Sequence, residues 1–288
     1  MPVEETKFAP RGGDGAKAVI PRGNAVERTY DVLRERILAG VYRPGVSLSQ
    51  VRLAEELVVS RTPLREALRR LEAENLVVNH ANRGVMVAPI YLGDVEDSYA
   101  VRLLVEPALV TGALDEVTES DVAAMAVALS EMEDTKVSSR EFQLAHWRYH
   151  RVLLARCPEG MRKLIESHLT RIDRHQRMYF ESPAVVCGLT ATDALFLQAI
   201  RVRDGAQARS LLEFHLLDTA LGMIMSLDAD HEFDSLTVTM EGLGIRLGDL
   251  ARLRAGEPVL IEWDQDIDLP PLATPNLITA RVPGAAVR

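Results

Sequence analysis

The chain has 288 residues, enough for about two domains, and its 47% hydrophobic and 26% charged residues exclude a disordered or fibrous protein. Its two cysteines, Cys157 and Cys187, form no CxxC pair, which excludes a disulfide framework and a cysteine-based zinc finger. No apolar run approaches about 18 residues and residues 1–24 lack the core of a signal peptide, so we expect a cytoplasmic protein with no membrane partner.

The net charge of −9 is distributed unevenly along the chain. Residues 25–92 carry ten Lys and Arg against eight Asp and Glu, whereas residues 93–288 carry 19 against 31. Charges act locally, because ordinary salt screens them over roughly 10 Å. A mildly basic module joined to an acidic body can therefore still bind a polyanion, and the acidic total does not exclude a nucleic acid partner.

Residues 25–90 contain three predicted helices and a predicted hairpin. Residues 1–24, rich in Gly, Pro and charge, precede them as a flexible leader. The first helix is expected to open at Asn24, where Glu27 completes a capping-box pattern, and to end at Gly40.

A second helix is expected to begin near Ser47 or Ser49, and a third after the N-cap residue Ser60. Two strand-like runs follow, at residues 76–78 and 85–87, and they are joined by residues with good hairpin-turn chemistry. Three helices and a hairpin in so short a segment predict a winged helix-turn-helix domain.

The pattern of residues 93–227 is helical almost throughout. The expected helices span residues 93–115, 119–134, 139–156, 160–180, 190–203 and 205–226. Because no strand-rich stretch interrupts them, the sequence predicts an antiparallel all-helical bundle. The fold class is therefore mainly α.

Residues 228–288 change character and are expected to form a short extension that contains β structure. Residues 236–240 alternate as a strand does, residues 247–253 suit a short helix, and residues 257–263 suit a second strand. The sequence leaves three roles open for this extension: it can pack on the bundle, exchange between subunits or recruit a partner.

Arginines follow one face of the third predicted helix. Arg61, Arg65 and Arg69 are spaced i, i+4 and i+8, while leucines occupy the opposite face. Such a helix can enter a major groove, where arginine pairs with guanine edges or with phosphate. Charged helix faces are also commonly just solvated, and neighbouring glutamates could neutralise these arginines. Spacing alone leaves both interpretations open.

Five further residues would extend a DNA contact. Ser60 and Thr62, at the start of the third helix, carry hydroxyl groups suited to phosphate oxygens. Arg52 of the second helix, with Arg83 and Gly84 at the tip of the wing, completes the positive surface.

Three segments closely resemble the DNA-binding domain of GntR-type transcription regulators. They are Ile37-Leu-Ala-Gly-Val-Tyr-Arg-Pro-Gly45, Leu53-Ala-Glu-Glu-Leu57 and Ser60-Arg-Thr-Pro-Leu-Arg-Glu-Ala-Leu-Arg-Arg-Leu71. This resemblance implies a homodimer that reads double-stranded operator DNA with its recognition helix and its wing. It also implies that Arg61 and Arg65 contact bases or phosphates.

The helical body resembles the FCD effector-binding domain of the FadR-like branch of this family. Arg102-Leu-Leu-Val-Glu106 matches the Arg-x-x-x-Glu of the first helix of that domain, and residues 200–216 match its two closing helices. The resemblance implies a small organic-acid effector. Arg102, with Arg171 and Arg174, could bind the acid bidentately.

Two histidines lie one helical turn apart in His146-Trp-Arg-Tyr-His150, so both imidazoles can reach one metal ion. The glutamate of a metalloprotease HExxH is absent. Metal-binding FCD domains place Asp-x-x-x-His on this helix and one His on each of the last two helices. By that resemblance His146 replaces the Asp, Asp193 replaces a His, and His215 is the fourth ligand. Three imidazoles and one carboxylate suit Zn²⁺, with Ni²⁺, Mn²⁺ or Fe²⁺ as alternatives.

The sequence therefore predicts a ligand-responsive transcription regulator, a repressor rather than an enzyme, whose body binds a small carboxylate with a divalent metal. Two alternatives stay open. One is a metal-dependent hydrolase that uses the His and Asp cluster to activate water. The other is a DNA-binding scaffold with an empty effector domain.

Overall fold

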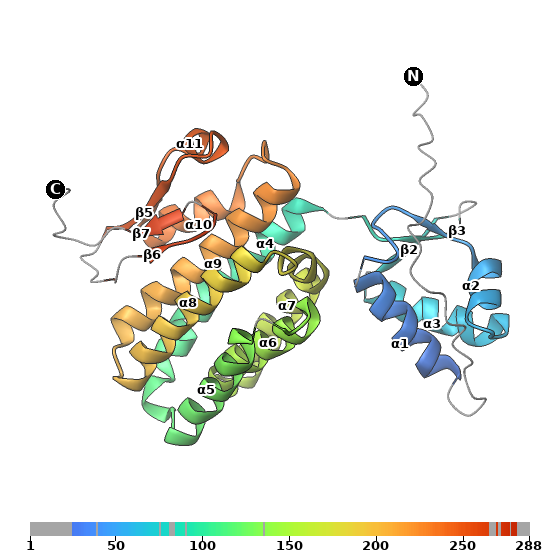
Figure 1. The fold of residues 1–288 in the computed structure, drawn as a ribbon, viewed down its shortest axis with the longest axis horizontal. Coiled ribbons are helices and arrows are strands. Elements are labelled where there is room, and N and C mark those ends of the chain that lie inside the picture. The colour runs from blue at the N-terminus through green and yellow to red at the C-terminus, as the bar shows by residue number, and fades with distance from the viewer. Residues whose placement is uncertain are drawn as a thin grey trace. The chain divides into compact units, whose positions relative to one another are not determined.

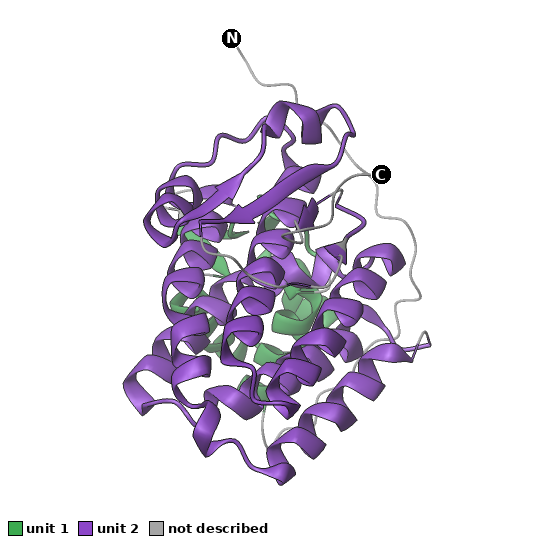
Figure 2. Ribbon diagram, turned by 90° about the vertical axis from the view of Figure 1, so that its left-hand side faces the viewer, with its two compact units in different colours: residues 1–90 green, residues 91–288 purple. Residues whose placement is uncertain are grey.

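The computed structural model describes residues 25–38, 40–74, 76–80, 84–89, 91–134, 136–264, 269, 272–276 and 278–280. The chain divides into two compact units, residues 1–90 and 91–288, which Figure 2 colours separately. Each unit has its own hydrophobic core. The predicted leader, the predicted cap at Asn24 and the wing residue Arg83 lie outside the described residues.

The first unit is a winged helix-turn-helix, as predicted (Figure 1). Its elements are α1 (Ala25–Leu38), β1 (Ser47–Leu48), α2 (Gln50–Glu56), α3 (Arg61–Ala73), β2 (Val77–His80) and β3 (Gly84–Val87). The three strands form an antiparallel sheet in the order β1-β3-β2. Ser49 caps α2 by accepting a hydrogen bond from the backbone N–H of Arg52, whereas Ser47 belongs to β1. Ser60 stands at the N-cap of α3 without a side-chain cap bond.

The second unit is built from long helices, as predicted (Figure 1). They are α4 (Leu92–Gly112), α5 (Glu119–Glu133), α6 (Ser139–Leu154), α7 (Glu159–Tyr179), α8 (Pro183–Arg201) and α9 (Gly205–Leu227), with a short 3₁₀ turn, η1 (Leu114–Glu116). Capping boxes at Thr118 and Ser138 start α5 and α6. The prediction that α8 begins at residue 190 is wrong. Ser182 is its N-cap and Pro183 occupies the first turn, where a missing N–H costs nothing.

Two helices, α8 and α9, are long and apolar enough to cross a membrane by length and composition alone. Half of the most apolar window of α8 and 83% of that of α9 are buried inside the structure. Packing against other helices therefore accounts for the apolar character of α9.

The extension continues the second unit with two short helices and a sheet. Its elements are α10 (Ser235–Leu243), β4 (Ile245–Leu247), α11 (Leu250–Arg254), β5 (Val259–Trp263), β6 (Leu272–Ala273) and β7 (Ile278–Ala280). The sheet order is β4-β5-β7-β6, with β5 and β7 parallel and the other pairs antiparallel. The strand predicted over residues 257–263 is present as β5.

The strand predicted over residues 236–240 is wrong, because this segment belongs to helix α10. Leu236 and Met240 are both buried, and a spacing of four residues puts them on one helix face. Gly244, with a φ of 67°, ends the helix in the left-handed conformation that glycine adopts without strain.

The extension is tied to the helical bundle at two helices. Glu96 of α4 accepts the backbone N–H of Leu236 at 3.0 Å, and its other carboxylate oxygen lies 2.8 Å from Nε2 of His231. Trp263 of β5 donates its indole N–H to Glu213 of α9 at 2.8 Å. Of the three roles left open by the sequence, packing on the bundle is therefore the one observed.

Residues 274–276, here called the docking segment, join the end of α7 to the interior of α9. The hydroxyl of Tyr179, the last residue of α7, donates to Oδ1 of Asn276 at 2.8 Å. The amide of Asn276 donates to a carboxylate oxygen of Asp218 on α9 at 3.0 Å, and the hydroxyl of Thr274 donates to the same oxygen at 2.6 Å. The docking segment thus fixes α7 to α9.

Two glycines inside helices allow this close approach. A Cβ added at Gly222 of α9 would overlap Tyr179 and Asn276. A Cβ added at Gly188 of α8 would lie 2.5 Å from the ring of Pro275. Glycine inside a helix costs roughly 1 kcal/mol relative to alanine, so contact with the docking segment gives a physical reason for both.

Replacing Gly222→Ala should destabilise the second unit by roughly 1–3 kcal/mol, because the added methyl overpacks a rigid contact. The matched control is Gly242→Ala in α10, where an added Cβ meets nothing within 4 Å. The control should be neutral or slightly stabilising, since alanine is the better helix former. Urea denaturation of both variants measures the difference, and equal stabilities would contradict the packing described here.

Candidate metal centre and nucleic-acid interface

The arginine face of α3 is exposed. Leu64 and Leu68 of this helix are buried against the core of the first unit, which turns Arg61, Arg65 and Arg69 toward solvent. Among the residues that the structure describes, no side chain forms a hydrogen bond or ion pair with Arg61 or Arg65.

Glutamates neutralise this face only in part. Glu66 accepts a hydrogen bond from Arg69 at 2.9 Å, so that arginine alone has an acidic neighbour on its own helix. Glu74 instead pairs with Arg34 of α1 at 3.3 Å. Two exposed guanidinium groups therefore remain for a polyanion.

The other predicted DNA contacts are exposed as well. Ser60 and Thr62 lie at the start of α3, and Arg52 lies on α2. Gly84 opens β3 with a φ of 77°. Contact between these residues and DNA stays a prediction.

The structure brings the four predicted metal ligands into one buried cluster. His146 and His150 come from α6, Asp193 from α8 and His215 from α9. One ligand atom from each of the four lies within 4.8 Å of the others. All four are buried, with exposed fractions of 3%, 7%, 1% and 3% in that order.

Nitrogen and oxygen atoms crowd the centre of this cluster. Nε2 of His146 lies 3.1 Å from Nε2 of His150 and 3.3 Å from Nε2 of His215. Asp193 approaches Nδ1 of His215 at 3.3 Å and Nε2 of His146 at 3.5 Å. Yet neither carboxylate oxygen of Asp193 receives a hydrogen bond from any described residue.

Burial sets the protonation of the cluster. It lowers the pKa of His146 to about 3 and holds the pKa of His150 and His215 well below its ordinary value. The charge of Arg102 lowers all three further. The imidazoles are therefore neutral, which is the form that binds metals.

The donor set fits a divalent cation. Burial raises the pKa of Asp193, because its charged form has no donor to compensate for lost water. A cation at the centre would stabilise the carboxylate and accept the lone pairs of three neutral imidazoles. Three nitrogens and one oxygen match the ligands that Zn²⁺ and related transition metals take.

Arg102 is a buried cation near this cluster. Its Nε donates to Glu106 at 2.9 Å, and its guanidinium lies 5.2 Å from the ring centroid of Tyr99. Arg174 is also buried, and burial lowers its pKa. Arg171 is exposed, and its contact with an effector stays a prediction.

The sequence did not indicate two aromatic rings that lie next to the cluster. Phe142 stacks on His146 with centroids 5.9 Å apart, and Phe180 meets the same imidazole edge-on at 5.6 Å. Phe142 stands one turn before His146, so helical spacing could have indicated it. Phe180 follows the end of α7, and no sequence pattern links it to the cluster.

Asp218 is another of the buried carboxyl groups of the bundle, and it lies one turn beyond His215 on α9. Burial raises its pKa from 3.8 to about 6, although hydrogen bonds from Thr274 and Asn276 lower it in part. The docking segment is therefore anchored on a group that titrates in weakly acidic solution.

Two known families match separate parts of the chain. Residues 25–87 match "Bacterial regulatory proteins, gntR family", and residues 97–218 match "FCD domain". The docking segment, residues 274–276, lies outside both matches, whereas its partners Tyr179 and Asp218 lie inside the second.

Similar proteins are transcription regulators. A galactonate operon transcriptional repressor of Escherichia coli (strain K12) is 29% identical over 64% of this chain and 90% of its own length. An uncharacterised HTH-type transcriptional regulator, YdhC of Bacillus subtilis (strain 168), is 31% identical over 36% of this chain. The match covers 46% of YdhC, about half its length. A solved GntR regulator of Rhodococcus sp. RHA1 shares the fold, with a TM-score of 0.59, 23% identity and coverage of 69% of this chain and 97% of its own.

The raised pKa of Asp218 predicts a pH dependence of stability. A carboxyl whose pKa is higher in the folded protein contributes stability at low pH, and that contribution is lost as pH rises from about 4 to 6. Above pH 6 the ionised group should cost up to about 3 kcal/mol. Asp218→Asn keeps an acceptor oxygen without the charge, so it should equal the natural protein near pH 4 and exceed it near pH 7.

Urea denaturation at both pH values measures this effect, with exposed Asp230→Asn as the control. A stability difference for Asp218→Asn that does not grow between pH 4 and pH 7 would overturn the assignment.

Proposed function

Because the chain belongs to the GntR family of bacterial regulatory proteins and carries an FCD domain, we propose that it is a cytoplasmic homodimeric repressor that releases operator DNA when a small organic acid binds. The observation that carries this proposal is a buried His₃Asp cluster near Arg102, in the same chain as an arginine face on which Arg61 and Arg65 are exposed. The relatives are transcription regulators rather than enzymes, so the hydrolase alternative lacks support.

The DNA contact is assigned to α3 and the wing. Arg61 and Arg65 are exposed, and neither has an acidic partner among the described residues. Arginines so placed can pair with guanine edges or phosphates in a major groove. Ser60, Thr62 and Arg52 would bind phosphates around them, because hydroxyls and cations at a helix start suit anionic oxygens.

The effector site is assigned to the centre of the bundle. His146, His150, Asp193 and His215 would hold a divalent metal, with Zn²⁺ first and Ni²⁺, Mn²⁺ or Fe²⁺ as alternatives. Such an ion supplies a Lewis acid that binds a carboxylate directly. Arg102 adds a fixed positive charge near the cluster, and its guanidinium is oriented by Glu106 and Tyr99.

Regulation then requires a coupling free energy between the two sites. Such couplings are typically 1–3 kcal/mol, which is enough to change operator affinity by roughly 5- to 150-fold. In a homodimer the two recognition helices must match half-sites about one helical turn apart, so a small change in their spacing lowers affinity. The alternative, a DNA-binding scaffold with an empty effector domain, would show no such response. The buried set of four potential metal ligands in this chain favours a domain that binds a ligand.

Replacing Arg65→Ala should weaken operator binding by about 1–3 kcal/mol, which is roughly 5- to 150-fold in affinity, without changing stability. The control is Arg70→Ala on the same helix, whose guanidinium instead pairs with Glu27 of α1 at 2.8 Å. An operator selected by the natural protein from random duplexes allows affinities to be compared by fluorescence anisotropy. Equal affinities for the natural protein and Arg65→Ala would remove α3 from the interface.

Replacing His150→Ala and His215→Ala together should abolish metal binding, because a pair of ligands cannot hold the ion that four would hold. Zinc content after dialysis, measured by inductively coupled plasma mass spectrometry, should fall from about one per chain to near zero. His168→Ala is the control, since His168 contacts Ser98 and not the cluster. A natural protein that retains no metal after zinc loading contradicts the proposal.

A further inference from the structure

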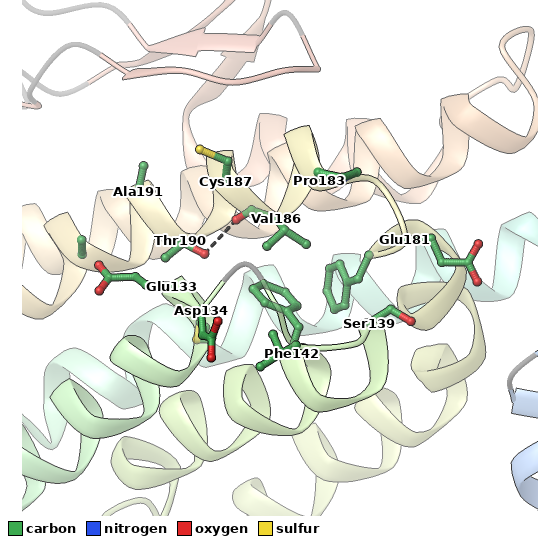
Figure 3. A pocket seen from close by; sticks show the side chains of 14 residues that line it. Glu133, Asp134, Ser139, Phe142, Glu181, Pro183, Val186, Cys187, Thr190 and Ala191 are labelled. Carbon is green, nitrogen blue, oxygen red and sulfur yellow. Dashed lines mark hydrogen bonds between the residues drawn. The ribbon is translucent and has the colours of Figure 1, made fainter.

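A cavity of about 560 Å³ lies between the first half of α8 and the corner joining α5 to α6 (Figure 3). This volume is within the roughly 300–1,000 Å³ of typical small-molecule sites. Its lining is mostly apolar and includes Met132, Val137, Phe142, Phe180 and Val186. Thr190 also lines it, but its hydroxyl donates to the backbone of its own helix at 2.8 Å.

The cavity shares a wall with the His₃Asp cluster. Phe142 and Phe180 both line the cavity, and both rings contact the imidazole of His146. One layer of aromatic rings therefore separates the cavity from a metal ligand. A ligand bound in the cavity would be a direct neighbour of the cluster.

The rim of the cavity is acidic, whereas the cluster lies near a positive charge. Glu133 and Asp134 lie at one end of the cavity and Glu181 at the other (Figure 3), and no basic side chain belongs to its lining. Arg102 lies on the cluster side, where its charge acts on His146. An organic acid would therefore be repelled at the rim and attracted at the cluster, which fixes its orientation.

We infer that this cavity receives the apolar body of the effector, and that the effector is an amphipathic monocarboxylate with an aromatic or branched group. This inference rests on the proposed function, because it takes the carboxylate to be bound at the cluster and Arg102. The apolar cavity then determines specificity. It selects against short acids, which leave it empty, and against sugar acids, whose hydroxyls would find almost no partners in it.

The aromatic wall must open for such a ligand. Phe142 and Phe180 are 1% and 2% exposed, so an acid that spans both compartments displaces one ring. Phe142 lies in the first turn of α6, whereas Phe180 is at the corner after α7. Phe180 is therefore the ring that moves. Its neighbour Tyr179 is held by Asn276, so the movement also acts on the docking segment.

The first test compares two acids on the zinc-loaded full-length protein by isothermal titration calorimetry. Butyrate reaches only the cluster, whereas 4-phenylbutyrate also carries a ring for the cavity. Burial of that ring should make 4-phenylbutyrate bind at least about tenfold more tightly. Equal affinities for the two acids would overturn the inference and leave the proposed carboxylate site intact.

The second test fills the cavity. Ala191 lines it and is exposed, so Ala191→Trp adds an indole there without disturbing a buried contact. This variant should lose the gain from the phenyl ring and keep its zinc content and its affinity for butyrate. Ala206→Trp, at an exposed alanine of α9 outside the cavity, should behave as the natural protein does.

The outcomes separate the two proposals. If Ala191→Trp retains the full preference for 4-phenylbutyrate, the ring binds elsewhere and the inference is wrong, although the carboxylate site stands. If neither acid binds the zinc-loaded natural protein, the proposed effector site fails and the inference fails with it. If Ala191→Trp abolishes the preference for 4-phenylbutyrate and Ala206→Trp keeps it, the result supports both proposals.

Discussion

The helical unit depends on one electrostatic constraint, the burial of the Asp193 carboxylate among three imidazoles without a hydrogen-bond donor. Moving such a charge from water into a protein interior costs several kcal/mol unless something compensates it. Burial keeps His146, His150 and His215 neutral, so they offer lone pairs rather than protons. A divalent cation at this position would satisfy all four groups at once. Because the four residues come from α6, α8 and α9, a bound ion would also fix the relative positions of these three helices.

A second constraint acts through glycines and the extension. Gly188 and Gly222 leave room for the docking segment, whose side chains join Tyr179 to Asp218. The docking segment itself lies outside the matched family segments, although Tyr179 and Asp218 lie inside one of them. The extension is therefore part of the packing of the bundle. Its removal would expose the buried carboxyl group of Asp218 and the surfaces of α8 and α9 at Gly188 and Gly222.

The sequence predicts those features that depend on regular spacing. The period of 3.6 residues indicates the arginine face of α3, and a spacing of four indicates His146 with His150. Asp193 and His215 come from other helices, and only the family resemblance indicates them. No local pattern could reveal Phe180 or the docking segment, because their contacts depend on tertiary packing. Alternation over residues 236–240 suits a strand, but the buried residues repeat every four, and the packing of that face on the bundle determines the helix.

These contacts make a continuous path from the cluster to the extension. His146 contacts Phe180, Tyr179 directly precedes Phe180 in the chain, and Asn276 joins Tyr179 to α9. A free corner between α7 and α8 would absorb the displacement of one ring locally. A corner held by Asn276 cannot absorb it, because movement of Tyr179 either breaks the hydrogen bond between Tyr179 and Asn276 or shifts the docking segment as well. Such a choice between two arrangements is what a switch requires. If the cavity binds the effector as proposed, the extension would convert its occupancy into a change at α9, the helix that also supplies His215.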